Sequence, residues 1–349
     1  MILYETITNT HPGFDQPAPL ENKLDEVYAF HKSLPQYKPT ELVELKDLAK
    51  TLGCKNICVK DESSRFRLNA FKALGASYAV SCLKDVKHLV SCTDGNHGRG
   101  LAWYGNLKGI PVDIFMPKGS EERRIRAIEM FNAKVTVTEF NYSDTVRYAA
   151  EYARKNGYTL VQDTAFDDYL EIPNNITLGY TTIIREALNQ MDEEPTHVFL
   201  QAGVGSLAAG AIYALELLCK KKPYIGVVES DQAACIYESF KQKKIVSIKG
   251  NPYTIMAGLN CGDPSITALP VFEESADWFI KASDQLTING MNRAVHPVGD
   301  DKAFVSGESG AVTLGLTEQI CLDNREYFHI DENSVFLLIS TEGILKNPE

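Results

Sequence analysis

The chain has 349 residues, of which 44% are hydrophobic and 23% charged, so it can bury a large core in one or two domains. Its formal net charge of −11 excludes broad affinity for nucleic acid or an anionic membrane, because such binding needs a concentrated basic surface. No apolar stretch approaches the length of a membrane span. The first four residues are apolar, but they lack the basic segment of a signal peptide. We therefore expect a cytoplasmic protein without nucleic-acid or membrane partners.

Eight cysteines are scattered along the chain, at positions 54, 58, 82, 92, 219, 235, 261 and 321. They form no CxxC motif and no Cys/His cluster with zinc spacing, so no metal site is expected. Free thiols in a reducing compartment are the default for such a pattern.

Short apolar runs alternate with longer amphipathic segments, which is typical of βα units and a largely parallel sheet. In chain order, the pattern predicts strands at residues 56–60, 88–93, 112–116, 134–139, 160–163, 197–201, 224–228 and 335–339. It predicts helices at residues 70–83, 98–107, 121–132, 143–156, 176–190, 207–219 and 310–321. Residues 251–301 are rich in Gly, Pro and Asn with weak periodicity, and no element is assigned there.

The strands separate into two sets around the long predicted helix that ends near Gln190. This indicates two α/β domains: a small one of residues 77–182, and a large one of residues 1–76 and 183–349.

The first segment that suggests chemistry surrounds Lys72, which has the apolar neighbours Phe71 and Ala73. Lysine is rarely buried without a reason, and desolvation favours the neutral amine, which attacks carbonyl groups. The alternative at this point is an ordinary helix lysine that reaches solvent.

The second segment follows a predicted strand and contains Thr93, Asp94, Gly95, Asn96 and His97. Glycines allow a close backbone approach, and a helix N-terminus offers free N–H groups to a carboxylate. A helix cap by Asp94 or Asn96 would explain one polar residue but not all four.

The third segment, residues 201–210, is again a strand, a glycine loop and a helix, a form that can hold a phosphate through backbone amides. It also imitates a nicotinamide dinucleotide site, because Glu229 ends the next strand where a ribose-binding acid would lie. Against that alternative, the Lys72 and Asn96 segments would then have no role. A fourth segment begins at Ser340, whose hydroxyl at a strand's carboxyl end would face the ligand crevice of an open α/β sheet.

Together these segments resemble the fold type II family of pyridoxal 5′-phosphate (PLP) enzymes, which includes threonine and serine dehydratases. The resemblance implies two doubly wound α/β domains with the cofactor in the cleft between them, and a homodimer. It also implies that Lys72 is the Schiff-base lysine, that Asn96 lies against the cofactor's ring oxygen, and that Ser340 meets the pyridine nitrogen. The phosphate would be held by Gly203, Val204, Gly205, Ser206 and Leu207.

Within this family the chain is most similar to the diaminopropionate ammonia-lyases. The resembling blocks run from about residue 37 to residue 343 and include 60–63, 68–72, 93–103, 116–120, 141–142, 161–165, 201–206, 255–259, 306–311 and 340–343. One departure is Arg67, which stands where the close relatives usually have glycine. Cys235 and Cys261 lie in matching blocks, and the sequence leaves open whether they pair or remain separate thiols.

Two acids support this branch on physical grounds. Asp94 stands where the dehydratases carry a small apolar residue, and Asp163 ends another predicted strand facing the same crevice. A carboxylate beside a cofactor is expensive to desolvate unless something compensates it, and a second ammonium group on the substrate would do so. The resemblance assigns Asp163 with Lys72 to the L isomer and Asp94 to the D isomer. If the two acids lie close together, one pKa should be raised.

We therefore predict α,β-elimination of 2,3-diaminopropionate to pyruvate and two ammonia, a step of amino-acid catabolism. The substrate would be bound by Thr93, Asp94, Gly95, His97 and Asp163. The alternatives are a serine or threonine dehydratase-type lyase of the same fold, a nicotinamide-dependent oxidoreductase, and a non-catalytic PLP-binding protein. Fold alone cannot separate them.

Overall fold

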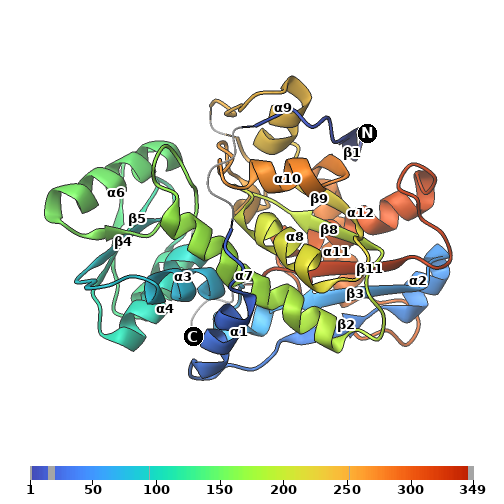
Figure 1. Cartoon of the computed structure of the whole chain (residues 1–349), viewed down its shortest axis with the longest axis horizontal. Coiled ribbons are helices and arrows are strands. Elements are labelled where there is room, and N and C mark those ends of the chain that lie inside the picture. Colours follow the sequence, from blue (N-terminus) through green and yellow to red (C-terminus); the bar gives the residue numbers. More distant parts are fainter. Residues whose placement is uncertain (1, 15–19, 94, 251, 345–349) are drawn as a thin grey trace.

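The computed structural model describes residues 2–14, 20–93, 95–250 and 252–344 and contains two sheets (Figure 1). The seven-stranded sheet has the order β1-β10-β9-β8-β11-β3-β2, and the four-stranded sheet has the order β6-β5-β4-β7. The strands of the larger sheet are β1 (Tyr4–Thr8), β2 (Glu41–Glu44), β3 (Asn56–Asp61), β8 (His197–Gln201), β9 (Tyr224–Ser230), β10 (Trp278–Ala282) and β11 (Val335–Ser340). Those of the smaller sheet are β4 (Leu89–Cys92), β5 (Val112–Met116), β6 (Lys134–Val137) and β7 (Thr159–Leu160).

The expectation of largely parallel sheets is confirmed. Every pair in the smaller sheet is parallel, as are the central pairs of the larger sheet from β10 to β3. Only the edge strands β1 and β2 pair antiparallel, with β10 and β3 respectively. All residues of β8 and β11 are buried, as expected of parallel strands covered on both faces.

Helices cover both faces of each sheet (Figure 1). Two core clusters join helices to the larger sheet. The first contains residues of α7 (Glu171–Gln190), α8 (Ser206–Leu218), α9 (Cys235–Gln242) and α10 (Leu269–Ser275). The second contains residues of α2 (Lys46–Leu52), α11 (Asp284–Val295) and α12 (Glu308–Asp323). The smaller sheet packs against α6 (Tyr142–Asn156) on one side and against α4 (Asn96–Lys108) and α5 (Glu122–Glu129) on the other. The remaining helices are α1 (Leu24–Ser33), α3 (Ala73–Ser81) and two 3₁₀ turns, η1 (Glu62–Arg67) and η2 (Ala257–Leu259).

Three helices meet at glycines where the two sheets join. A Cβ on Gly100 of α4 would lie 2.8 Å from the Ala73 Cα of α3, and one on Gly179 of α7 would lie 2.7 Å from the Gly75 Cα of α3. Glycine is needed here because the backbones approach too closely for any side chain. These contacts fix the start of α3, directly after Lys72.

The predicted domain limits stay a prediction. The strands of the smaller sheet all lie between residues 89 and 160, whereas α7 runs without a break through the predicted limit at residues 182 and 183. Among the described residues, none of the helices combines the length and apolar character that crossing a bilayer requires.

Candidate active site

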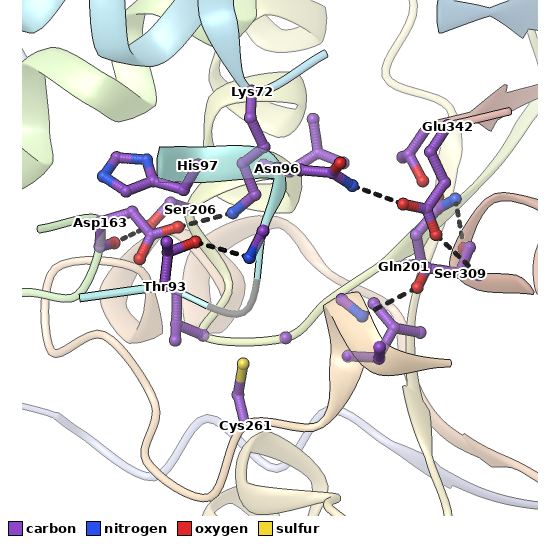
Figure 2. Close-up of a pocket in the computed structure, with 18 of the residues that line it drawn as sticks. Lys72, Thr93, Asn96, His97, Asp163, Gln201, Ser206, Cys261, Ser309 and Glu342 are labelled. Carbon is purple, nitrogen blue, oxygen red and sulfur yellow. Dashed lines mark hydrogen bonds and ion pairs between the residues drawn. The ribbon is translucent and has the colours of Figure 1, made fainter. Parts of the chain in front are cut away.

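A cavity opens where strands of both sheets end, and it encloses about 840 Å³ when its open mouth is included. Pockets for small ligands typically have volumes of roughly 300–1,000 Å³. Its walls contain Lys72 after β3, four residues after β4 (Thr93, Gly95, Asn96 and His97), the 201–207 segment after β8, and Thr341 and Glu342 after β11. The four segments singled out in the sequence thus converge on one site (Figure 2).

Lys72 and Asp163 form an ion pair in this cavity. Lys72 Nζ lies 2.6 Å from Asp163 Oδ2, and the side chains are 20% and 7% exposed. Burial alone would lower the pKa of Lys72, but the Asp163 carboxylate outweighs it and raises that pKa above its ordinary value. Burial alone would raise the pKa of Asp163, but Lys72 and, to a smaller degree, His97 lower it to about 2.

In the cofactor-free chain Asp163 therefore favours the charged form of Lys72, and the neutral amine expected of the cofactor-bound chain stays a prediction. The carboxylate of Asp163 compensates the buried ammonium, which apolar neighbours in the sequence could not reveal. The pKa of Asp163 is lowered for the same reason, and the expectation that one of the two predicted acids has a raised pKa stays a prediction. Asp94, the other predicted acid, lies outside the described residues.

The backbone ahead of Lys72 is unusual. Phe66, Arg67 and Asn69 have φ angles of 49°, 62° and 61°, in the left-handed region that favours glycine. Asn69 Nδ2 donates to the Gly343 carbonyl at 2.9 Å, and Gly343 N–H donates to the Asn69 carbonyl at 3.0 Å. This exchange ties the Lys72 segment to the end of β11.

A buried ionic cluster joins the residues before Lys72 to α7. Arg65 lies 2.7 Å from Glu62 and 2.8 Å from Glu186 of α7, which in turn lies 2.9 Å from Lys60. All four side chains are at most 1% exposed. Removing one partner of such a cluster leaves an uncompensated buried charge, so the cluster fixes η1 against α7.

The loop after β4 is organised by Thr93. Its Oγ1 accepts from Gly95 N–H at 2.9 Å and Gly98 N–H at 3.2 Å, so it caps the start of α4. His97 Nε2 bonds to the Val161 carbonyl at 2.8 Å, which places the proton on Nε2, while the buried Nδ1 has no partner in the described part of the chain. Burial lowers the pKa of His97 more than nearby Asp163 raises it, so the ring is neutral.

The glycine loop after β8 fits a phosphate. Gly205 has a φ of 106°, and a Cβ on Gly203 would lie 2.7 Å from the Gly258 carbonyl oxygen, so backbone alone forms this wall. The helix α8 starts at Ser206, and its first amides have no carbonyl partner within the helix, which suits an anion. Ser206 Oγ donates to the Asp163 carbonyl at 2.7 Å, and Val204 and Leu207 line the cavity. The residues present therefore fit a phosphate-bearing cofactor.

The structure does not support Glu229 as the ribose-binding acid of a nicotinamide dinucleotide site. Glu229 is 1% exposed and accepts from the N–H groups of Ile236 and Tyr237 at 2.9 and 2.6 Å. Its carboxylate therefore caps the start of α9 and does not line the cavity.

Ser340 is buried, and its Oγ donates to Ser306 Oγ at 2.8 Å. The cavity wall at the end of β11 is instead lined by the next two residues, Thr341 and Glu342. Contact between Ser340 and a pyridine nitrogen stays a prediction.

Among the lining residues to which the sequence assigned no role are Arg124, Cys261, Ser309 and Glu342. Glu342 had a usable signal, since it lies two residues after the carboxyl end of a buried strand, where side chains can face the ligand crevice. The other three had no local signal, because they belong to α5, the η2 region and α12. Cys235 and Cys261 do not form a disulfide with each other.

The fold and this cavity define a class of enzymes. A family model described as pyridoxal-phosphate dependent enzyme matches residues 34–340, and the chain belongs to this family. Its cofactor is accordingly PLP.

Particular members of the family are more similar than others. The chain is 41% identical over 344 residues to the diaminopropionate ammonia-lyase of Escherichia coli strain K12, covering 90% of this chain and 86% of the relative. It is also 41% identical to the enzyme of the same name from Salmonella typhimurium, covering 91% and 88%. A crystal structure of the E. coli enzyme in complex with an aminoacrylate-PLP azomethine reaction intermediate has a TM-score of 0.91 at 38% identity, covering 99% of this chain and 95% of that one.

Proposed function

We propose that the chain is a PLP-dependent carbon–nitrogen lyase that eliminates ammonia from 2,3-diaminopropionate, and that hydrolysis of the released aminoacrylate by water yields pyruvate and a second ammonia. The observation that carries the proposal is the buried pair of Lys72 and Asp163 in one cavity with the glycine loop after β8. The relatives named diaminopropionate ammonia-lyase, at 41% identity over most of both chains, support the choice of substrate.

The residues of the cavity divide the task of holding PLP. Lys72 would hold the aldehyde group, Asn96 the ring oxygen, Ser340 the ring nitrogen, and Gly203, Val204, Gly205, Ser206 and Leu207 the phosphate. When bound, PLP supplies an electron-withdrawing system that acidifies the α-hydrogen of the substrate.

Proton transfer is the task of the Lys72–Asp163 pair. While Lys72 carries its charge, the pKa of Asp163 is about 2 and the carboxylate is a weak base. Once Lys72 is uncharged, burial is no longer offset and raises the pKa of Asp163, so that it becomes a better base. The basicity of Asp163 thus depends on the charge of its neighbour. We assign this pair to the L isomer and Asp94 to the D isomer.

The neutral His97 imidazole adds a second polar function. Its Nδ1 is an unprotonated acceptor and can receive a hydrogen bond from a substrate ammonium group. We place His97 with Thr93, Asp94, Gly95 and Asp163 in the substrate site, where acceptors and acids suit a substrate with two ammonium groups.

Ammonia and pyruvate release from D- and L-diaminopropionate, measured beside D- and L-serine, tests the proposal. We expect diaminopropionate to be the better substrate by at least tenfold in kcat/KM. Lys72→Ala should lose both turnover and the visible absorbance band of the cofactor-loaded enzyme. Serine preferred over diaminopropionate would support the dehydratase alternative, and normal activity of Lys72→Ala would refute the mechanism.

We also propose a cytoplasmic homodimer that acts in amino-acid catabolism. The support is the eight cysteines, none of which is in a disulfide within the described part of the chain, as suits a reducing compartment, and the resemblance to a family of dimers. Light scattering of the purified protein checks the dimer, and cell fractionation checks the compartment.

A further inference from the structure

Glu342 brings a carboxylate into the cavity wall, where its two oxygens face different elements. Its Oε2 accepts from Asn96 Nδ2 at 2.5 Å, and its Oε1 accepts from the Ser309 N–H near the start of α12 at 3.3 Å (Figure 2). Among the described residues, Glu342 has no ion-pair partner, so neutral donors hold this carboxylate. Its bond to Asn96 joins the loop after β11 to the first residue of α4.

The chemistry of the two groups fixes the orientation of the Asn96 amide. An ionised carboxylate only accepts hydrogen bonds, whereas an amide has one accepting end and one donating end. The two ends are nearly alike in shape, so a rotation of 180° would exchange them at little steric cost. Opposite Glu342, only the NH₂ end is favourable, because the carbonyl end would meet a carboxylate oxygen.

Glu342 is itself held in place. Its backbone pairs with Ala70, two residues before Lys72, and its carbonyl accepts from Gly307 N–H at 2.7 Å. A Cβ on Gly307 would lie 2.9 Å from Glu342 Cγ, so the glycine leaves the room that the glutamate side chain fills. The carboxylate is thus a fixed reference point for Asn96.

We propose that Glu342 is a positioning residue that turns the NH₂ group of Asn96 toward the cavity. One N–H is bound by Glu342, and the second remains for an acceptor oxygen of the bound ligand. The inference rests on the proposed function, in which that acceptor is the ring oxygen of PLP. Glu342 would then act on cofactor binding only through Asn96.

A double-mutant cycle tests this dependence. The variants are Glu342→Ala, Asn96→Ala and the double variant, and the readouts are the dissociation constant of PLP and the wavelength of the cofactor's absorbance band. A hydrogen bond to a charged group contributes enough that we expect Glu342→Ala to weaken PLP binding about tenfold and to shift the band. In the Asn96→Ala background, the same substitution should change neither.

Two further variants control for folding and for charge. Glu342→Gln keeps an acceptor oxygen and the side-chain shape, so PLP affinity should stay within about threefold of wild type. Glu308→Gln removes an acid next to the same entrance that does not line the inner cavity, and PLP affinity should be unchanged. Thermal unfolding of each cofactor-free variant identifies any that do not fold.

Two results would overturn the inference. Equal loss of PLP affinity from Glu342→Ala in both backgrounds would mean that the carboxylate acts independently of Asn96. Unchanged PLP affinity with a selective loss of kcat/KM for diaminopropionate over serine would mean that Glu342 binds the second ammonium group directly. Failure of the proposed function is distinguishable, because wild-type protein would then prefer serine to diaminopropionate, whereas the inference is tested by the PLP affinities of the variants.

Discussion

Replacing Asp163 by asparagine should change the charge of Lys72. The substitution keeps the shape of the side chain and one acceptor oxygen, but it removes the negative charge 2.6 Å from Lys72 Nζ. Burial, the largest influence on the pKa of Lys72, is then no longer outweighed. We expect this pKa to fall from above its ordinary value to below it.

The magnitude follows from two limits. Removing one partner of a buried ion pair destabilises a protein by about 3–5 kcal/mol. The loss has an upper limit, because Lys72 can give up its proton, and deprotonating an ordinary lysine at pH 7 costs about 5 kcal/mol. The cofactor-free Asp163→Asn variant should therefore lose about 3–5 kcal/mol in free energy of unfolding at pH 7.

Urea unfolding of the cofactor-free protein measures this loss, and the pH dependence of PLP binding reports the charge of Lys72. PLP binding to Asp163→Asn should begin at lower pH than in wild type, because the neutral amine is the reactive form. Asp113→Asn is a matched control: Asp113 is a buried acid that bonds Tyr152 at 2.9 Å and does not line the cavity. It should leave the pH dependence of PLP binding unchanged.

Acid unfolding provides a second readout with a defined sign. The folded pKa of Asp163 lies below its ordinary value of 3.8, so its contribution to stability is present above pH 3.8 and is lost as pH falls toward 2. The Asp163→Asn variant should lack this part of the acid transition. A loss below about 1 kcal/mol at pH 7, with an unshifted pH dependence of PLP binding, would refute the reasoning.

Three smaller predictions concern other positions. Arg67→Gly should raise the free energy of unfolding by up to about 1 kcal/mol in urea, since Arg67 is exposed with a φ of 62°, whereas Arg67→Ala should have little effect. Burial raises the pKa of Glu229 to about 8, so the free energy of unfolding of the wild type should fall as pH rises from 4.5 to 8, by at most about 1.4 kcal/mol per pH unit. Urea unfolding of Glu229→Gln at several pH values should lack that slope. Gly100→Ala should cost about 1–3 kcal/mol in urea unfolding and weaken PLP binding, because its Cβ would lie 2.8 Å from the Ala73 Cα; unchanged affinity would contradict the role of this crossing.

The strands that could be predicted from sequence are those whose burial shows in their own residues. All eight predicted strands are present, and β5 and β8 have the predicted bounds. The edge strand β1 was missed because it is polar and only partly buried, and its partner β10 lies some 270 residues away. That partner, with α10, α11 and the 3₁₀ turn η2, lies in the segment 251–301, whose weak periodicity concealed all four elements.

Helix ends near the site differ from the prediction for local reasons. The helix α3 starts at Ala73 and not at residue 70, because Asn69 is left-handed and bonds to Gly343. Conversely, α4 starts at Asn96 and not at residue 98, because Thr93 caps it. Residues that read as loop, Asn96 and His97, thus belong to the first helical turn.

The sequence predicted which segments meet in the cavity, but not how their side chains pair. Lys72, Asn96, His97, Asp163 and the glycine loop line one cavity, as expected from segments at the carboxyl ends of parallel strands. The pairing of Lys72 with Asp163 could not be derived, because the two residues lie 91 positions apart and their contact depends on how the two sheets are placed.

That placement is the condition on which the site depends. Two polar contacts of the cavity cross from one sheet to the other: Lys72, after β3, meets Asp163, after β7, and Glu342, after β11, meets Asn96, after β4. A hydrogen bond weakens steeply with small displacements, so the two sheets must be held to within a fraction of an ångström. The close glycine crossings of α3, α4 and α7 provide that constraint at the start of α3, next to Lys72. The chemistry of the cavity therefore depends on helix packing outside it, which explains why a methyl group added at such a crossing should disturb cofactor binding without touching the cofactor.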